Sequence, residues 1–106
     1  MEDCIFCKIR DRKIAKEFTY EDDDVMVFPD IHPLKPTHLL IVPKSHVEDF
    51  TELNDSTLMT KIKKIINKMI EEKLNSKGYR ISINGGGAQV VRHMHFHLMG
   101  PISMND

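Results

Sequence analysis

Three histidines alternate with apolar residues near the end of the sequence. The segment reads His93-Met94-His95-Phe96-His97-Leu98-Met99. Side chains two residues apart leave the same face of a β-strand, whereas an α-helix would scatter these rings over roughly 200° of arc. The alternation therefore predicts a strand over 93–99 that carries three imidazoles on one face and buries the apolar side chains on the other.

Imidazoles gathered on one face suit two kinds of chemistry. In nucleophilic catalysis one ring attacks phosphorus, while its neighbours orient it and stabilise charge on the phosphoryl oxygens. In metal ligation the three rings bind one ion, as in three-histidine zinc sites. An incidental run on a surface strand is the third explanation, and the strict interleaving with apolar residues argues against it.

A glycine-rich segment stands shortly before these histidines. It reads Asn84-Gly85-Gly86-Gly87-Ala88-Gln89 and predicts a flexible loop. Glycines let main-chain N–H groups approach a phosphate closely, and Asn84 and Gln89 add side-chain donors. A mobile hairpin explains the loop equally well when the loop is considered alone. Beside a face of imidazoles, the loop favours an anionic substrate.

Two cysteines, Cys4 and Cys7, form a C-x-x-C pair close to the N-terminus. This spacing is that of half a zinc site and also of a redox dithiol. A redox pair would be expected to follow a strand and open a helix within a βαβ unit, and the sequence predicts no such unit around it. Zinc ligation, two inert thiols and redox chemistry all stay open on spacing alone.

The whole chain, residues 1–106, has the length of a single domain. Lys and Arg total 15 against 16 Asp and Glu, for a formal charge of −1, which argues against the basic face that duplex binding needs. No window approaches the ~18–20 consecutive apolar residues of a membrane span, and the N-terminus lacks the pattern of a signal peptide. We therefore expect a cytoplasmic protein without nucleic-acid or membrane partners.

Several short strands and one long helix are predicted to position these groups. The long helix lies between the capping side chains of 54–56 and Gly78, and apolar residues recur inside it every three or four positions. A short helix is expected within 4–13, and the predicted strands are 17–20, 25–28, 38–42, 79–84 and 93–99. This order favours an α+β fold with a largely antiparallel sheet over a doubly wound α/β fold.

The histidine segment, taken together with the segments before it, resembles a known family. Three histidines, each followed by an apolar residue, match the signature of the histidine triad (HIT) family. The other matching segments are Cys4-Ile5-Phe6-Cys7-Lys8-Ile9, Phe28-Pro29-Asp30-Ile31, Pro36 to His46, Gly78 to Asn84, and Ala88-Gln89. They cover residues 4 to 101 in the right order, and the likeness is to the Hint-like branch of small nucleotide phosphoramidases with an N-terminal C-x-x-C.

The resemblance implies a HIT-like α+β fold: a five-stranded antiparallel sheet with one long helix and a short N-terminal helix, paired into a homodimer. It also implies a nucleotide hydrolase or transferase that cleaves a P–N or P–O–P bond of a purine nucleoside phosphoramidate or dinucleotide-like substrate. The nucleotide would pass to the middle histidine, His95, and then to water. His97 would hold the phosphoryl oxygens, His93 would orient the nucleophile, and His38 would be an accessory histidine.

The nucleotide pocket that the resemblance implies is apolar around the base and polar around the sugar and phosphate. Asp30 would receive the ribose hydroxyls, and the phosphate would meet Asn84, Gln89 and His97. The walls of the purine pocket would be Ile5, Phe6, Ile9, Phe28 and Ile31. These residue types suit the task, because a carboxylate accepts hydrogen bonds from a diol and apolar side chains pack on a flat base.

A structural zinc is a further implication of the resemblance, since a subset of bacterial triad proteins with the C-x-x-C pair binds one. Its ligands here would be Cys4, Cys7, His46 and His93. A closed Cys₂His₂ site has no open position, so this zinc would be structural rather than catalytic. The chemistry expected at His95 requires no cofactor.

Three departures from the family pattern bear on function. Val90 stands directly after the glutamine, where relatives carry a Ser or Thr that assists the leaving group. The glycine-rich loop is shorter than in typical relatives, and the sequence ends soon after Gly100-Pro101, without the longer tail of many relatives. Val90 keeps open the alternative of a nucleotide-binding regulatory protein with little turnover. The three histidines themselves leave a second alternative, a metalloenzyme with an ion on the triad.

Overall fold

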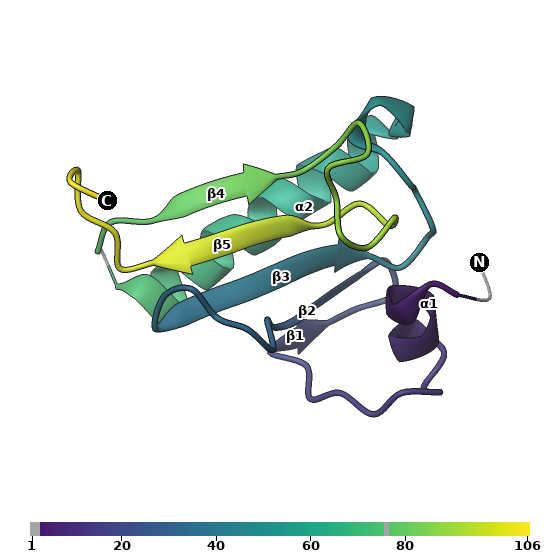
Figure 1. Ribbon diagram of the computed structural model, residues 1–106, viewed down its shortest axis with the longest axis horizontal. Coiled ribbons are helices and arrows are strands. Elements are labelled where there is room, and N and C mark those ends of the chain that lie inside the picture. Colours follow the sequence, from purple (N-terminus) through teal and green to yellow (C-terminus); the bar gives the residue numbers. More distant parts are fainter. Residues whose placement is uncertain (1–2, 76) are drawn as a thin grey trace.

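A five-stranded antiparallel sheet with a helix on each face makes up the computed structural model, which describes residues 3–75 and 77–106 (Figure 1). The elements are α1 (Ile5–Arg10), β1 (Tyr20–Glu21), β2 (Val25–Pro29), β3 (Thr37–Pro43), the 3-10 helix η1 (Phe50–Glu52), α2 (Ser56–Met69), the π-helical turn η2 (Ile70–Leu74), β4 (Arg80–Ile83) and β5 (Phe96–Gly100). The strand order is β1-β2-β3-β5-β4. The predicted α+β architecture is confirmed; of the predicted domain 1–106, residues 1, 2 and 76 lie outside the described residues.

The two faces of the sheet bury separate cores. Alternate residues of β2 and β3 divide between them: Val25, Val27, Leu39 and Ile41 face α2, and Met26, Phe28, Leu40 and Val42 face α1. Figure 1 shows α2 running behind the sheet, with α1 on the near side. Met94, Phe96 and Leu98 belong to the core beneath α2. The predicted burial of the residues between the histidines is therefore confirmed.

The long helix begins where the sequence predicted and ends earlier. Asp55 is its N-cap, and a carboxylate oxygen of Asp55 accepts the Leu58 N–H at 3.1 Å. The helical run α2–η2 closes at Asn75, which adopts a left-handed φ of 45°. The prediction that Gly78 stops the helix is wrong, because Asn75 tolerates this conformation and ends the helix first. Among the described residues, no helix has both the length and the apolar character needed to cross a membrane.

Gly78 has a packing role instead. Its carbonyl accepts the Ile102 N–H at 2.8 Å, and a Cβ at this position would collide with the Ile102 main chain. The C-terminal segment therefore lies directly against the start of β4.

The first strand is shorter than predicted. Strand pairing covers only Tyr20 and Glu21, which lie opposite Val27 and Met26; the predicted strand was 17–20. The acidic residues after it form a tight turn, in which Asp22 Oδ1 accepts the N–H groups of Asp24 and Val25. The turn side chain thus caps the main chain that starts β2.

The last strand starts at Phe96, so the prediction of a strand over 93–99 is wrong for its first three residues. The His93 N–H donates to the Val91 carbonyl, and the Met94 N–H donates to the Val47 carbonyl. These groups bond outside the sheet, and β4 pairs with β5 only from Phe96 onward. Only His97 of the three histidines lies on a regular strand.

Candidate active site and metal centre

A cavity of about 320 Å³ opens beside α1 on the histidine face of the sheet. It brings together most of the residues predicted to bind or attack a nucleotide: Ile5, Phe6, Ile9, Phe28, Asp30, Ile31, Asn84, His95 and His97. They come from α1, from the end of β2 and the two residues after it, from the residue after β4, and from β5 and the segment that leads into it. The tertiary structure therefore assembles one site from segments that are far apart in the sequence.

The floor of the cavity crosses three neighbouring strands. Phe28 on β2 pairs with Leu40 on β3, and Leu40 pairs with His97 on β5. Neighbouring strands lie about 4.8 Å apart, so Phe28 and His97 are separated by roughly 10 Å across the sheet. The Phe6 ring covers this row, with its centroid 5.7 Å from that of Phe28 and 5.0 Å from that of His95. The cavity therefore has an apolar end at Phe28 and an imidazole end at His97.

The ring of His95 is held in a defined tautomer. Its Nδ1 lies 2.8 Å from the carbonyl oxygen of His93, which can only accept a hydrogen bond. Nδ1 therefore carries the proton, and Nε2 keeps its lone pair. Since His95 lines the cavity, this arrangement is that of an imidazole ready to act as a nucleophile or base.

The ring of His97 has the opposite tautomer, set by a chain of two hydrogen bonds. The Leu34 N–H donates to His38 Nδ1 at 3.1 Å, so the neutral His38 ring carries its proton on Nε2. That Nε2 lies 2.9 Å from Nδ1 of His97 and donates to it. The remaining nitrogen of His97, Nε2, therefore carries an N–H, which can donate to an anionic oxygen.

Asp30 stands beside this pair. Its Oδ1 accepts the His32 N–H at 2.8 Å, and its Oδ2 lies 3.5 Å from His38 Nε2. The ligand atoms of Asp30, His38 and His97 lie within 4.8 Å of one another, which is close enough to surround an ion. His38 has no free lone pair for a metal, however, because Nδ1 accepts the Leu34 N–H and Nε2 is protonated. The group fits a hydrogen-bond relay better than a metal site.

Burial lowers the pKa of each histidine in the triad segment. The pKa of His93, which is fully buried, falls to about 4, and desolvation is the largest cause. Desolvation is also the largest cause for His95 and His97, and the nearby rings of His95 and His38 lower the pKa of His97 further. All three rings are therefore uncharged at neutral pH, each with one N–H and one lone pair.

The third histidine, His93, lies in a separate cluster with the two cysteines and His46. The Sγ of Cys4 lies 3.3 Å from His93 Nδ1, and the Sγ of Cys7 lies 3.3 Å from His46 Nδ1 and 3.6 Å from His93 Nδ1. On its other side, His93 Nε2 donates to the carbonyl oxygen of Pro43 at 2.6 Å. Both nitrogens of His93 are thus engaged away from His95 and His97, so the three triad rings do not face one ion.

The cysteine–histidine cluster fits a tetrahedral zinc. Bonds of about 2.3 Å to sulfur and 2.0–2.1 Å to nitrogen would place these atoms about 3.6 Å apart, which is close to the observed separations. The Pro43 carbonyl fixes the His93 tautomer that leaves Nδ1 free to ligate, as an outer-shell acceptor commonly does at metal sites. Burial raises the pKa of the Cys7 thiol, and a bound cation would reverse this by stabilising the thiolate.

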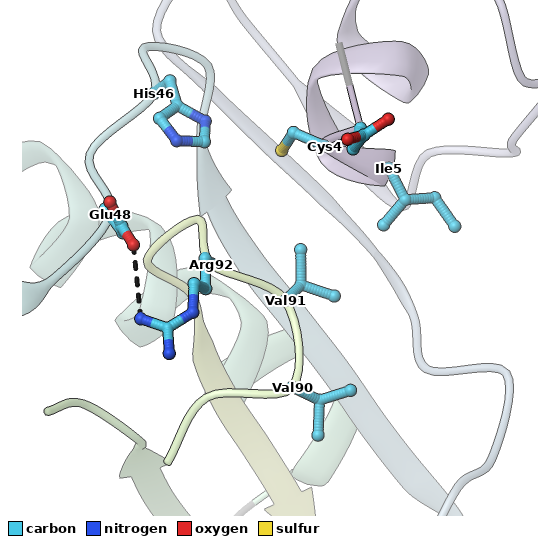
Figure 2. Close-up of a pocket in the computed structure, with 8 residues that line it drawn as sticks. Cys4, Ile5, His46, Glu48, Val90, Val91 and Arg92 are labelled. Carbon is cyan, nitrogen blue, oxygen red and sulfur yellow. Dashed lines mark hydrogen bonds and ion pairs between the residues drawn. The ribbon is translucent and has the colours of Figure 1, made fainter. Parts of the chain in front are cut away.

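A larger hollow of about 560 Å³ lies next to this cluster (Figure 2). Ile5, Val90 and Val91 line it and also line the smaller cavity, so they form a wall between the two. Its rim carries the Glu48–Arg92 ion pair at 3.3 Å, drawn as a dashed line in Figure 2. The hollow does not reach His95 or His97, so the smaller cavity is the candidate reaction site.

Main-chain N–H groups of the glycine-rich loop donate hydrogen bonds within the protein, so they are not free to bind a ligand. The Gly86 N–H donates to Asp49 Oδ1 at 2.6 Å, and the Gly87 N–H donates to Gln89 Oε1 at 2.9 Å. The expectation that these amides cradle a phosphate is therefore corrected. The positive φ angles of Gly86 (65°) and Gly87 (95°) explain why glycine stands there.

Gln89 is the predicted binding residue that the structure does not bring to the cavity. Its Nε2 donates to the Glu48 carbonyl at 3.0 Å, and its Oε1 accepts the Gly87 N–H. With both polar atoms bonded to the main chain, the buried side chain braces the loop. The other predicted binding residues all line the cavity.

Several groups at the site have no equivalent among the predictions: Pro29, His32 and Val91 line the cavity, and three others bear on its geometry. Leu40 lies between Phe28 and His97 on the cavity floor, Lys16 lines the apolar end, and the Leu34 amide sets the His38 tautomer. Strand alternation in 38–42 places Leu40 on the face of His38 and could have identified it. Nothing in the sequence distinguishes Lys16 from the other lysines or indicates the Leu34 contact.

Comparison with known proteins finds relatives of this chain by sequence and by structure, and they agree on the family. The family described as "Scavenger mRNA decapping enzyme C-term binding" matches residues 3–106. A HIT-like protein of Methanocaldococcus jannaschii is 43% identical over 100 residues, which cover 91% of this chain and 77% of that protein. A HIT family hydrolase from Legionella pneumophila Philadelphia 1 has a TM-score of 0.88 at 40% identity, over 96% of each chain. A histidine triad protein from Clostridium difficile has a TM-score of 0.89 at 36% identity, over 100% of this chain and 96% of that one.

Proposed function

Because the chain belongs to the histidine triad (HIT) family and has the fold of HIT family hydrolases, we propose that it cleaves purine nucleoside phosphoramidates or dinucleotide-like substrates through a nucleotidyl-His95 intermediate. The observation that carries this proposal is the tautomer of His95. Its Nδ1–H is held by the His93 carbonyl, which leaves the Nε2 lone pair free in the cavity. An uncharged ring with a free lone pair is a nucleophile toward phosphorus.

The proposed reaction has two displacement steps at phosphorus. In the first, His95 Nε2 forms a bond to phosphorus while the bond to the leaving nitrogen or oxygen breaks, and the leaving group takes the electron pair and a proton from solvent water. The N–H of His97 Nε2 donates to a phosphoryl oxygen, where charge develops. In the second step, water attacks phosphorus, the N–P bond breaks, and the lone pair returns to His95 with loss of a proton to solvent. The nucleoside monophosphate then leaves.

The substrate is placed by the two ends of the cavity. The base packs among Phe6, Phe28 and Ile31, and Asp30 accepts hydrogen bonds from the ribose hydroxyls. Asp30 suits this role, because the main chain donates a hydrogen bond only to Oδ1 and the carboxylate can accept further hydrogen bonds. Incubation with adenosine 5′-phosphoramidate, with chromatography for AMP release and intact-mass analysis for the adduct, tests the proposal.

A nucleotide-binding protein with little turnover is the second candidate, and Val90 is the observation that favours it. Val90 is 95% exposed and lines the cavity, but it has no hydroxyl with which to assist a leaving group. The proton for the departing amine would then come from His97, water or the substrate itself. Tight binding of a purine mononucleotide with no turnover on phosphoramidates or dinucleoside polyphosphates would identify this candidate.

A structural zinc on Cys4, Cys7, His46 and His93 belongs to the same proposal. Support comes from the compact donor set and from the fixed His93 tautomer. Zinc held there would tie α1 to the β3 end and to the segment before β5. Since α1 supplies Ile5, Phe6 and Ile9 to the cavity, the metal would also stabilise the wall of the base pocket.

Removing His38 tests its role as a positioning residue. His38→Leu deletes the donor to His97 Nδ1, and we expect kcat/KM to fall on the order of tenfold, less than the ~10²-fold cost of deleting a direct donor to an oxyanion. His38→Gln, whose amide can both accept and donate, should recover much of the activity. NMR titration supplies the independent readout: the His38 ring lowers the pKa of His97, so the pKa of His97 should rise in His38→Leu. An unchanged His97 titration would contradict the relay.

A homodimer is also part of the proposal, with the edge strand β4 as the contact. Tyr79 and Ile81 are exposed there, and they line a hollow of about 240 Å³ with apolar residues of α2. An unpaired, apolar strand edge is a surface that a second copy can cover. We expect light scattering to give twice the chain mass of 12.3 kDa for the wild type and the single mass for Ile81→Lys. Met104→Lys, at another exposed apolar residue, should leave the mass unchanged.

A further inference from the structure

A single lysine lines the apolar end of the cavity. Lys16 lies in the segment between α1 and β1, is half-buried, and places Nζ 5.3 Å from the centroid of the Phe28 ring. Among the described residues that line the cavity, it is the only lysine or arginine. No carboxylate of the part of the chain that the structure describes lies within ion-pair distance of it. Apart from the Phe28 ring face, which attracts the cation, Lys16 has no partner among the described residues, so its N–H donors can meet a hydrogen-bond acceptor of a ligand.

The order of groups along the cavity shows which part of a nucleotide Lys16 would meet. His97 lies on β5, and the ligand atoms of Asp30 and His97 lie within 4.8 Å of one another. Leu40 and then Phe28 follow across β3 and β2, with Lys16 at the Phe28 ring. A nucleotide with phosphate at the histidines and ribose at Asp30 directs its base over Leu40 and Phe28. Position 6 of a purine lies on the side of the ring system away from the sugar, and it therefore points toward Lys16.

We propose that Lys16 reads position 6 of the base and that the cavity prefers 6-oxopurines, guanine and hypoxanthine, to adenine. This inference rests on the proposed function, since it assumes that the cavity binds a purine nucleotide. An ammonium group has three donors and no acceptor. Guanine and hypoxanthine present a carbonyl oxygen at position 6, whereas adenine presents an amino group, which is itself a donor there. Lys16 can donate a hydrogen bond to the carbonyl oxygen of guanine or hypoxanthine. Beside adenine, the ammonium group meets another donor, and neither group has an acceptor.

The surroundings of Lys16 strengthen this discrimination. The face of the Phe28 ring attracts the ammonium group and holds Nζ at this end of the cavity, but it offers the N–H donors no lone pair. A half-buried donor that loses its partner is not fully compensated by solvent. We expect guanosine and inosine monophosphates to bind about tenfold more tightly than AMP, the discrimination typical of one charged contact to a base edge.

Titration calorimetry with GMP, IMP and AMP tests the inference on the whole protein. Lys16→Met keeps the length of the side chain and removes its charge, so the preference for GMP and IMP should fall below about twofold. Lys16→Arg keeps the donors and should keep the preference. Lys13→Met is the matched control, because Lys13 is exposed, lies three residues away and does not line the cavity; its affinities should equal those of the wild type.

The possible outcomes separate the inference from the function on which it rests. A preference for GMP and IMP that disappears in Lys16→Met and survives in Lys16→Arg and Lys13→Met supports the inference. Equal or tighter binding of AMP by the wild type overturns it, and so does a preference that Lys16→Met leaves intact; nucleotide binding itself would stand in both cases. Absence of binding by all three nucleotides would overturn the proposed function together with the inference.

Discussion

Replacing His95 by asparagine should abolish both turnover of adenosine 5′-phosphoramidate and the nucleotidylated form of the protein. In the proposed mechanism His95 Nε2 attacks phosphorus with its free lone pair, and asparagine has no comparable nucleophile. We expect kcat/KM to fall on the order of 10⁴-fold or more, as when the nucleophile of a covalent mechanism is removed. AMP release measures the rate, and intact-mass analysis after rapid acid quench detects the adduct.

Two controls separate lost chemistry from lost structure. His95→Asn should still bind AMP with an affinity close to that of the wild type, because the base and ribose contacts are untouched. His97→Leu removes a donor to the phosphoryl oxygens but keeps the nucleophile, so the adduct should still form at a rate lower by about 10²-fold. An adduct on His95→Asn, or a rate within tenfold of the wild type, would show that the nucleophile lies elsewhere.

Replacing Cys7 by serine should remove the metal and lower the melting temperature by roughly 10 °C. Purified wild-type protein should carry about one zinc per chain, and Cys7→Ser should carry almost none, because three ligands cannot close a tetrahedral structural site. A loss of about 2 kcal/mol corresponds to a shift of this size in a domain of this length. Elemental analysis measures the zinc, and calorimetry measures the melting temperature.

Chelation distinguishes loss of the metal from loss of packing at Cys7, which is buried. A strong chelator should lower the melting temperature of the wild type by about the same amount and leave that of Cys7→Ser nearly unchanged. Nucleotide affinity of the wild type should also fall on chelation, since α1 carries both Cys7 and the cavity residues Phe6 and Ile9. A wild-type melting temperature that is insensitive to chelation, in protein shown to contain zinc, would exclude a structural role.

Local patterns of the sequence identify the elements of the fold. Alternation places Met94, Phe96 and Leu98 in the core beneath α2, and an apolar repeat with Asp55 at its start marks the long helix. Such patterns are visible because they depend on neighbours only a few residues away. The same locality explains the errors at the element ends. Asn75 rather than Gly78 ends the helical run, and the strand begins at Phe96 because main-chain groups before it bond to other segments.

The sequence contains the triad, its order and the residue types of a nucleotide site, because these are properties of the chain itself. The tautomer of each imidazole is not a property of the chain alone, since a hydrogen bond to another main-chain or side-chain group decides which nitrogen carries the proton. His93 Nε2 meets the carbonyl of Pro43, fifty positions earlier, and His97 takes its tautomer from His38 and the Leu34 amide. Three histidines that are equivalent in the sequence thus differ in the nitrogen that carries the proton and in the groups they face, and they do so only when the sheet and α1 bring these partners together.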